Sequence, residues 1–158
     1  MLNANNTYFA EFKRISDEFK AARDERENCK QKIIDTYGWE SDELKAWYEE
    51  GRAVVFPFSQ GVCKAYYAWQ WSLSMKEDEV EMEDFLWEDE VADFIDAFRK
   101  AKIETFVYTN KSSAVMENLH WFVAEGCKIK ELCTITRPEH YLGEEKPVEI
   151  MGVRFSLN

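Results

Sequence analysis

The chain has 158 residues, a formal net charge of −11, and a composition that is 46% hydrophobic and 15% aromatic. This length suits one domain that buries roughly 70% of the surface its unfolded form would expose. The aromatic content predicts a packed core, and the excess of acids disfavours binding to nucleic acid or anionic lipid. No apolar run is long enough to span a bilayer, and the first residues lack the pattern of a signal peptide, so we expect a cytoplasmic protein.

Helical patterns fill the first third of the chain. Apolar residues recur every three or four positions from residue 6 to residue 37, which predicts a long amphipathic helix ended by Gly38. Arg26 interrupts this apolar series. The helix packs one stripe on the protein's own core or, alternatively, forms a coiled-coil dimer. Ser41 is placed to cap a second, shorter helix through Glu50.

The next segment is extended and then helical. Residues 53–58 (AVVFPF) predict an edge strand or an extended connection, because Pro57 has no N–H to donate to a sheet. Ser59 offers a cap to a helix with an apolar face. Aromatic residues crowd this helix, and without a basic cluster beside them we expect them to belong to the core. These residues are Tyr66, Tyr67, Trp69 and Trp71.

The excess negative charge is concentrated in residues 77–96, which hold eleven acids and no base. Without them, the remainder of the chain carries 20 acidic and 20 basic residues. Apolar residues run through the tract, and they predict a helix over residues 89–101 with acids at its start and bases at its end, as a helix dipole favours. We expect the tract to attract a basic partner. The predicted acidic surface comprises Glu77, Asp78, Glu79, Glu81, Glu83, Asp84, Glu88 and Asp89.

The C-terminal third has the pattern strand, helix, strand. Residues 104–109 and 129–136 predict strands, and residues 113–125 predict a helix that turns Val115, Leu119, Phe122 and Val123 inward. The two strands are expected to be parallel neighbours in a βαβ unit. A polar loop follows, and the alternation in residues 148–157 predicts a half-buried C-terminal edge strand.

These patterns predict an α/β fold, with α+β as the alternative. A mainly helical part, residues 1–75, is expected to pack on a small sheet whose parallel unit spans residues 104–136. Residues 89–158 contribute one helix, the βαβ unit and the C-terminal strand. The whole of residues 1–158 is expected to form a single domain.

Two stretches carry a resemblance. The run FVYTNKSSAVMENLHWFVAEGCKIKELCTITR at residues 106–137, with GVRFS at residues 152–156, resembles the C-terminal part of a group of small uncharacterised acidic proteins of bacteria and their phages or mobile elements. The resemblance implies a cytoplasmic accessory protein. It supplies no activity and no functional residues.

One place is suited to a small-molecule site. In open sheets of parallel strands, ligands bind beyond the carboxyl ends of the strands, near helix N-termini. Here that edge would gather a phosphate or carboxylate cradle, or the same residues would merely cap a helix and form a turn. The residues of this predicted cradle are Thr109, Asn110, Lys111, Ser112, Ser113, Thr136, Arg137 and His140.

Catalytic and metal motifs are lacking. The sequence has no GxGxxG, no P-loop and no GxSxG, and its histidines and cysteines match no zinc pattern, so we expect neither a catalytic centre nor a metal or cofactor. Two functions stay open: an accessory protein, monomeric or dimeric, whose acidic surface binds a basic protein, or a ligand-binding domain or enzyme that uses the strand-end cradle. No direct binding to nucleic acid or membrane is expected.

Overall fold

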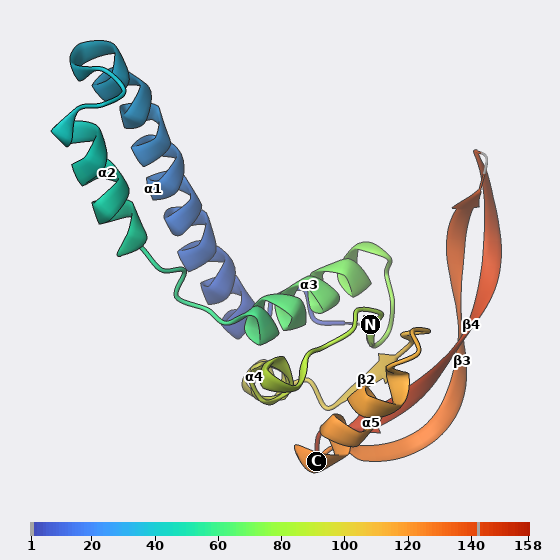
Figure 1. The fold of residues 1–158 in the computed structure, drawn as a ribbon. Helices are drawn as coiled ribbons and strands as arrows, with labels where there is room; N and C mark the ends of the chain where they lie inside the picture. Colours follow the sequence, from blue (N-terminus) through green and yellow to red (C-terminus); the bar gives the residue numbers. More distant parts are fainter. Residues whose placement is uncertain (1, 142) are drawn as a thin grey trace. The chain divides into compact units, whose positions relative to one another are not determined.

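The computed structural model describes residues 2–141 and 143–158, apart from the side chains of residues 139–141. The elements in chain order are α1 (Thr7–Tyr37), α2 (Asp42–Arg52), α3 (Gln60–Ser74), β1 (Val80–Met82), α4 (Glu88–Lys100), β2 (Thr105–Tyr108), α5 (Val115–Ala124), β3 (Lys128–Tyr141) and β4 (Glu144–Ser156) (Figure 1). Among the described residues, no helix has both the length and the apolar character of a membrane span.

The chain divides into two compact units. One is Phe9–Phe58, and the other joins the N-terminal residues through Tyr8 to Ser59–Asn158. We call them the helical unit and the sheet unit, and we describe each by itself. That residues 1–158 form a single domain stays a prediction.

The helical unit contains most of α1 and all of α2. Its first helix has the predicted extent and ends at Gly38, whose φ of +89° lies in the left-handed region that favours glycine. Ser41 caps α2 as predicted, because its Oγ accepts a hydrogen bond from the N–H of Leu44 at 3.2 Å.

An extended connection follows α2. Residues 53–58 form no strand, which agrees with the second of the two alternatives that Pro57 allowed. The connection packs through its phenylalanines: the ring centroids of Phe56 and Phe19 lie 5.1 Å apart, and those of Phe58 and Phe12 lie 4.6 Å apart. These aromatic pairs attach the connection to α1.

In the sheet unit, α3 and α4 lie in close contact. Ser59 caps α3 as predicted. Gly61 makes the approach possible, because a Cβ at this position would stand 2.2 Å from the carbonyl oxygen of Glu90 on α4. The predicted charge pattern of α4 is also confirmed, with three acids in its first turn and Arg99 and Lys100 in its last.

The sheet has four strands in the order β1-β2-β4-β3. β1 is parallel to β2, and α4 connects them, so these elements form a βαβ unit. β4 is antiparallel to both of its neighbours, β2 and β3. The predicted α/β class is confirmed, with helices α3, α4 and α5 packed on a small mixed sheet.

The predicted pairing of the strands around α5 was wrong in one respect. β2 and β3 run in the same direction in one sheet, but β4 lies between them, so they are not neighbours. This arrangement buries Phe155 of β4 completely, next to Phe106 of β2, at a ring-centroid distance of 5.3 Å. β4 pairs with β3 along its length and with β2 only over Val153–Ser156, so its first part lies at an edge of the sheet.

Two further strand predictions need correction. Residues 137–147, predicted as a polar loop, mostly continue the β3–β4 hairpin, whose register runs out to Tyr141 and Glu144. A two-stranded ribbon leaves both faces to solvent and needs no apolar side chains, so the polar sequence gave no strand signal. Figure 1 shows this ribbon projecting beyond the other strands of the sheet unit. β1, inside the acidic tract, was not predicted, because its three residues are too few to show a period.

Phenylalanine rings form the core of the sheet unit. Phe106 on β2 contacts Phe98 of α4 and Phe122 of α5, with ring centroids 5.5 and 5.3 Å apart. All three side chains are fully buried. On α5 the inward positions are Asn118 and Phe122, whereas Val123, predicted to point inward, is 48% exposed. The core therefore lies between α4 and α5 on one side and one face of the sheet on the other.

Candidate functional site

On the other face of the sheet, polar contacts gather around Glu81 of the edge strand β1. It lies on β1 with a side chain 3% exposed. Its Oε1 accepts a hydrogen bond from Thr109 Oγ1 at 2.8 Å and another from Arg137 Nη1 at 3.0 Å. The structure thus brings together two residues of the predicted cradle, and the group they share is a carboxylate of the protein itself.

The other cradle residues are dispersed. Asn110 forms a turn, since its Oδ1 accepts from the N–H of Ser112 at 2.8 Å and its Nδ2 donates to the Glu83 carbonyl at 2.7 Å. Three residues of the loop before α5 are exposed, and none caps the helix through its side chain: Lys111, Ser112 and Ser113. Thr136 is exposed and, next to Arg137 on a strand, points to the opposite face. The side chain of His140 lies outside the described residues.

Acidic residues alternate through β1 and its two flanking positions, and they place their side chains on one face. The Glu79 carboxylate contacts Arg154 of β4 at 2.8 Å, and Glu83 contacts Arg137 at 3.3 Å. Val80 and Met82, between them, are buried on the core side. Part of the predicted acidic surface is therefore neutralised by arginines of β3 and β4, which lie farther across the sheet.

The remaining acids of the predicted surface differ in environment. Glu88 and Asp89 are exposed in the first turn of α4, where the helix dipole favours them, and Asp78 and Asp84 are exposed as well. Glu77 is half-buried. Burial raises the pKa of Glu77, the nearby carboxylate of Glu81 raises it further, and Arg137 acts in the opposite direction.

The segment between β1 and α4 is fixed by a buried side chain that sequence reasoning missed. Asn118 on α5 is fully buried, and its amide accepts a hydrogen bond from the N–H of Leu86 at 2.9 Å and donates to the carbonyl of the same residue at 2.7 Å. The hydroxyl of Tyr108 also donates to this amide. A polar residue on the inward face of a predicted helix was the only signal in the sequence.

A pocket of about 280 Å³ opens beside Glu81. We call it the acidic pocket; its lining residues are Tyr67, Ala68, Trp71, Glu81, Met82, Glu83 and Asp84. Tyr67 and Trp71 are 59% and 47% exposed, so two of the aromatic residues expected in the core are at the surface, while Tyr66 and Trp69 are buried as expected. Within the described part of the chain, Oε2 of Glu81 is buried and has no hydrogen-bond partner.

The arrangement is suited to a cation. Three carboxylates line the pocket, those of Glu81, Glu83 and Asp84, whereas Arg137 supplies a single guanidinium to the first two. Exposed aromatic faces attract cations through their quadrupoles, and a buried carboxylate oxygen favours a charged donor. Chemically, the pocket can hold a lysine or arginine side chain, and it offers little to an anion.

Comparison with known proteins gives the family. The model of a domain of unknown function, DUF7698, matches residues 64–157, which is well over half of the chain. The chain belongs to the DUF7698 family. This confirms the predicted similarity to uncharacterised proteins over the C-terminal part, and it extends that similarity to α3 and β1. No curated protein and no solved structure matches the chain.

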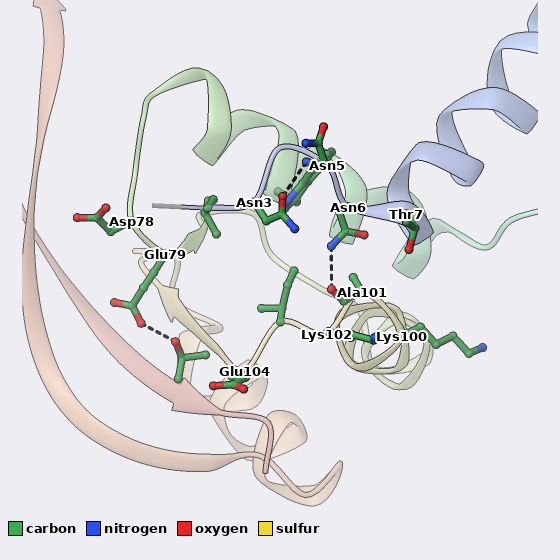
Figure 2. Close-up of a pocket in the computed structure, with 14 residues that line it drawn as sticks. Asn3, Asn5, Asn6, Thr7, Asp78, Glu79, Lys100, Ala101, Lys102 and Glu104 are labelled. Carbon is green, nitrogen blue, oxygen red and sulfur yellow. Dashed lines mark hydrogen bonds between the residues drawn. The ribbon is translucent and has the colours of Figure 1, made fainter.

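The DUF7698 match covers every residue that lines the acidic pocket. A second cavity, of about 570 Å³, falls partly outside it, because the N-terminal residues Leu2 to Thr7 form one wall (Figure 2). Its polar groups largely serve one another: Asn6 Nδ2 donates to the carbonyl of Ala101 at 2.7 Å, and Thr105 Oγ1 donates to Glu79 at 2.7 Å. The acidic pocket is therefore the stronger candidate.

The thiols of the DUF7698 domain are not activated nucleophiles. Cys127 is buried, and burial raises its pKa to about 11. Burial also raises the pKa of Cys133. Both thiols are thus protonated at neutral pH.

Proposed function

We propose that this DUF7698 protein binds a basic polypeptide, one of whose lysine or arginine side chains enters the acidic pocket. The observation that carries the proposal is the buried carboxylate oxygen of Glu81, without a partner among the described residues, in a pocket walled by the exposed rings of Tyr67 and Trp71. A protonated side chain would supply the donor that this oxygen lacks.

The size and charge of the pocket favour this class of partner. A volume of about 280 Å³ is at or below the range of roughly 300 to 1,000 Å³ typical of small-molecule sites, so one side chain suits it better than a nucleotide. Exposed acids at Asp84, Glu88 and Asp89 add a negative field around it. Such a field steers a basic partner toward the surface and makes its association depend on salt.

The predicted anion site at the strand ends is less well supported, because its arginine, Arg137, is held by two carboxylates. From the resemblance of residues 106–137, we further propose that the protein is a cytoplasmic accessory protein of bacteria or of their phages and mobile elements.

The proposal is tested with fluorescent oligolysine and oligoarginine peptides, whose binding is followed by anisotropy. We expect the double variant Glu83→Gln, Asp84→Asn to bind about tenfold more weakly, because two exposed ion pairs are lost. Trp71→Ala should weaken binding by about 0.5 to 2 kcal/mol through the lost cation–π contact.

The matched control is the double variant Glu88→Gln, Asp89→Asn, which removes the same charge from exposed positions that do not line the pocket. It should retain most of the affinity. Equal losses in the two double variants would show that only net charge matters, and the pocket proposal would then fail. Binding that is unchanged between ~50 and ~300 mM salt would exclude an electrostatic cause.

A further inference from the structure

The helical unit contains a cavity of about 530 Å³ between α1 and the α2 region, independent of the acidic pocket and outside the matched residues 64–157. Apolar walls and positive charge meet in it. The residues that matter to the argument are Phe19, Trp47 and Val54, with Arg23, Arg26 and Arg52. The lining residues include these three guanidiniums and one carboxylate, that of Glu27, and Arg23 also lies 3.8 Å from the carboxylate of Asp24.

Arg26, which interrupts the apolar stripe of α1, occupies the centre of this arrangement. Its guanidinium lies over the ring of Trp47, 4.6 Å from the centroid, and the Trp47 indole N–H donates to the Arg26 carbonyl at 3.1 Å. The hydrogen bond fixes the indole against the backbone of α1, and the indole in turn supports the guanidinium by stacking. The charge that interrupts the amphipathic pattern of α1 is thus stacked on an aromatic ring of the same unit.

Part of that guanidinium lacks an acceptor in the described part of the chain. Nη2 is buried and has no hydrogen-bond partner within the described residues. The ion pair that the group forms with a described residue is long, 3.6 Å from Nη1 to Glu50, whose side chain is 74% exposed. A buried N–H without an acceptor is costly, so an acceptor that enters the cavity would gain a strong interaction.

Gly51 permits this geometry. A Cβ at position 51 would stand 2.9 Å from Nη2 of Arg26, closer than a normal contact. The absence of a side chain on α2 therefore lets the guanidinium lie against that helix.

We propose that this cavity binds a small amphipathic carboxylate, with the carboxylate on Arg26 and the apolar part against Phe19, Trp47 and Val54. A planar carboxylate accepts from a guanidinium with matched geometry. Arg23 and Arg52 strengthen the positive field at the site. Inorganic phosphate is disfavoured, because its oxygens would lose their hydration between the apolar walls of the cavity.

The experiment uses the full chain and phenylacetate as the probe. Phenylacetamide keeps the ring without the charge, acetate keeps the charge without the ring, and inorganic phosphate tests for a general anion site. Binding is followed by titration calorimetry and by NMR shifts of the Arg26 Nε–H and the Trp47 indole N–H. We expect saturable binding of phenylacetate. Phenylacetamide lacks the charge-assisted hydrogen bond, acetate lacks the apolar contacts, and phosphate is disfavoured by the apolar walls, so each should bind at least about tenfold more weakly.

Variants locate the site. Arg26→Gln should weaken phenylacetate binding by about tenfold or more. Arg14→Gln is the matched control, because it removes the same charge from the same helix at an exposed position that does not line the cavity. Gly51→Ala should also weaken binding by displacing the guanidinium. Circular dichroism checks that each variant keeps its helices.

Three binding results would overturn the proposal: no saturable binding of phenylacetate, equal affinity for phenylacetamide, or an affinity for phenylacetate that Arg26→Gln leaves unchanged. Shifts confined to residues of the sheet unit would do so as well.

Discussion

Removing Arg137 should destabilise the sheet unit strongly, because it leaves the carboxylate of Glu81 buried with only the hydroxyl of Thr109. Glu81 is 3% exposed, and the side chain of Arg137 is 14% exposed. Breaking a buried ion pair by deleting one partner costs about 3 to 5 kcal/mol. We expect the lower end of this range for Arg137→Met, since the guanidinium is not fully buried. For a chain of this length, ~3 kcal/mol corresponds to a fall in Tm of roughly 6 to 12 °C.

A double-mutant cycle makes the reasoning testable. Glu81→Leu together with Arg137→Met replaces the pair by apolar side chains, which is often neutral or stabilising for buried pairs. We therefore expect the double variant to recover most of the stability that Arg137→Met loses. Urea unfolding followed by tryptophan fluorescence and circular dichroism measures all four free energies. If Arg137→Met costs less than about 1 kcal/mol, or if the double variant loses the sum of the single losses, the buried-pair argument is wrong.

Other predictions follow from single contacts. Phe122→Ala should cost about 3 to 5 kcal/mol in chemical unfolding, whereas Val123→Ala, on the exposed side of the same helix, should cost less than about 0.5 kcal/mol; similar losses would mean that the helix face is wrong. Gly61→Ala should destabilise by more than about 2 kcal/mol, because its Cβ meets the backbone carbonyl of Glu90; a melting temperature within a degree or so of the parent would contradict that contact. Because the folded state holds the Cys127 thiol protonated up to a pKa of about 11 and the ordinary value is 9.0, the unfolded chain loses this proton first as pH rises. The free energy of unfolding should therefore fall between pH 9.0 and about 11, and Cys127→Ala should reduce this fall. If the variant keeps the same dependence of stability on pH, the fall does not come from Cys127.

Local signals in the sequence were sufficient for most of the helices. Ser41 and Ser59 cap the helices that they were expected to cap, and Gly38 ends α1. These outcomes depend on a few neighbouring residues, whose conformational preferences are strong. The distribution of charge in α4 was equally readable, because it follows from the dipole of the helix itself.

The order of the strands and the site depended on distant pairings that no local pattern encodes. The position of β4 between β2 and β3 is set by burial of Phe155, far along the chain from Phe106. Arg137 was predicted to bind an anion, and its carboxylate partners lie on β1 and just after it, in a strand too short to be foreseen. The exposure of Tyr67 and Trp71 was easier to predict from the sequence, since the two residues lie on a different face of the helix from Tyr66 and Trp69.

The hold of Asn118 on Leu86 has a consequence for how the acidic pocket can change. The Asn118 amide bonds both the N–H and the carbonyl of Leu86, as the backbone of an adjoining strand would. The side chain of Leu86 is fully buried. These main-chain hydrogen bonds do not involve the side chains at positions 83 and 84, which line the pocket, although Glu83 adds an ion pair to Arg137. Substitutions at these two positions can therefore change which partner the pocket prefers, while the hydrogen bonds between Asn118 and Leu86 stay intact.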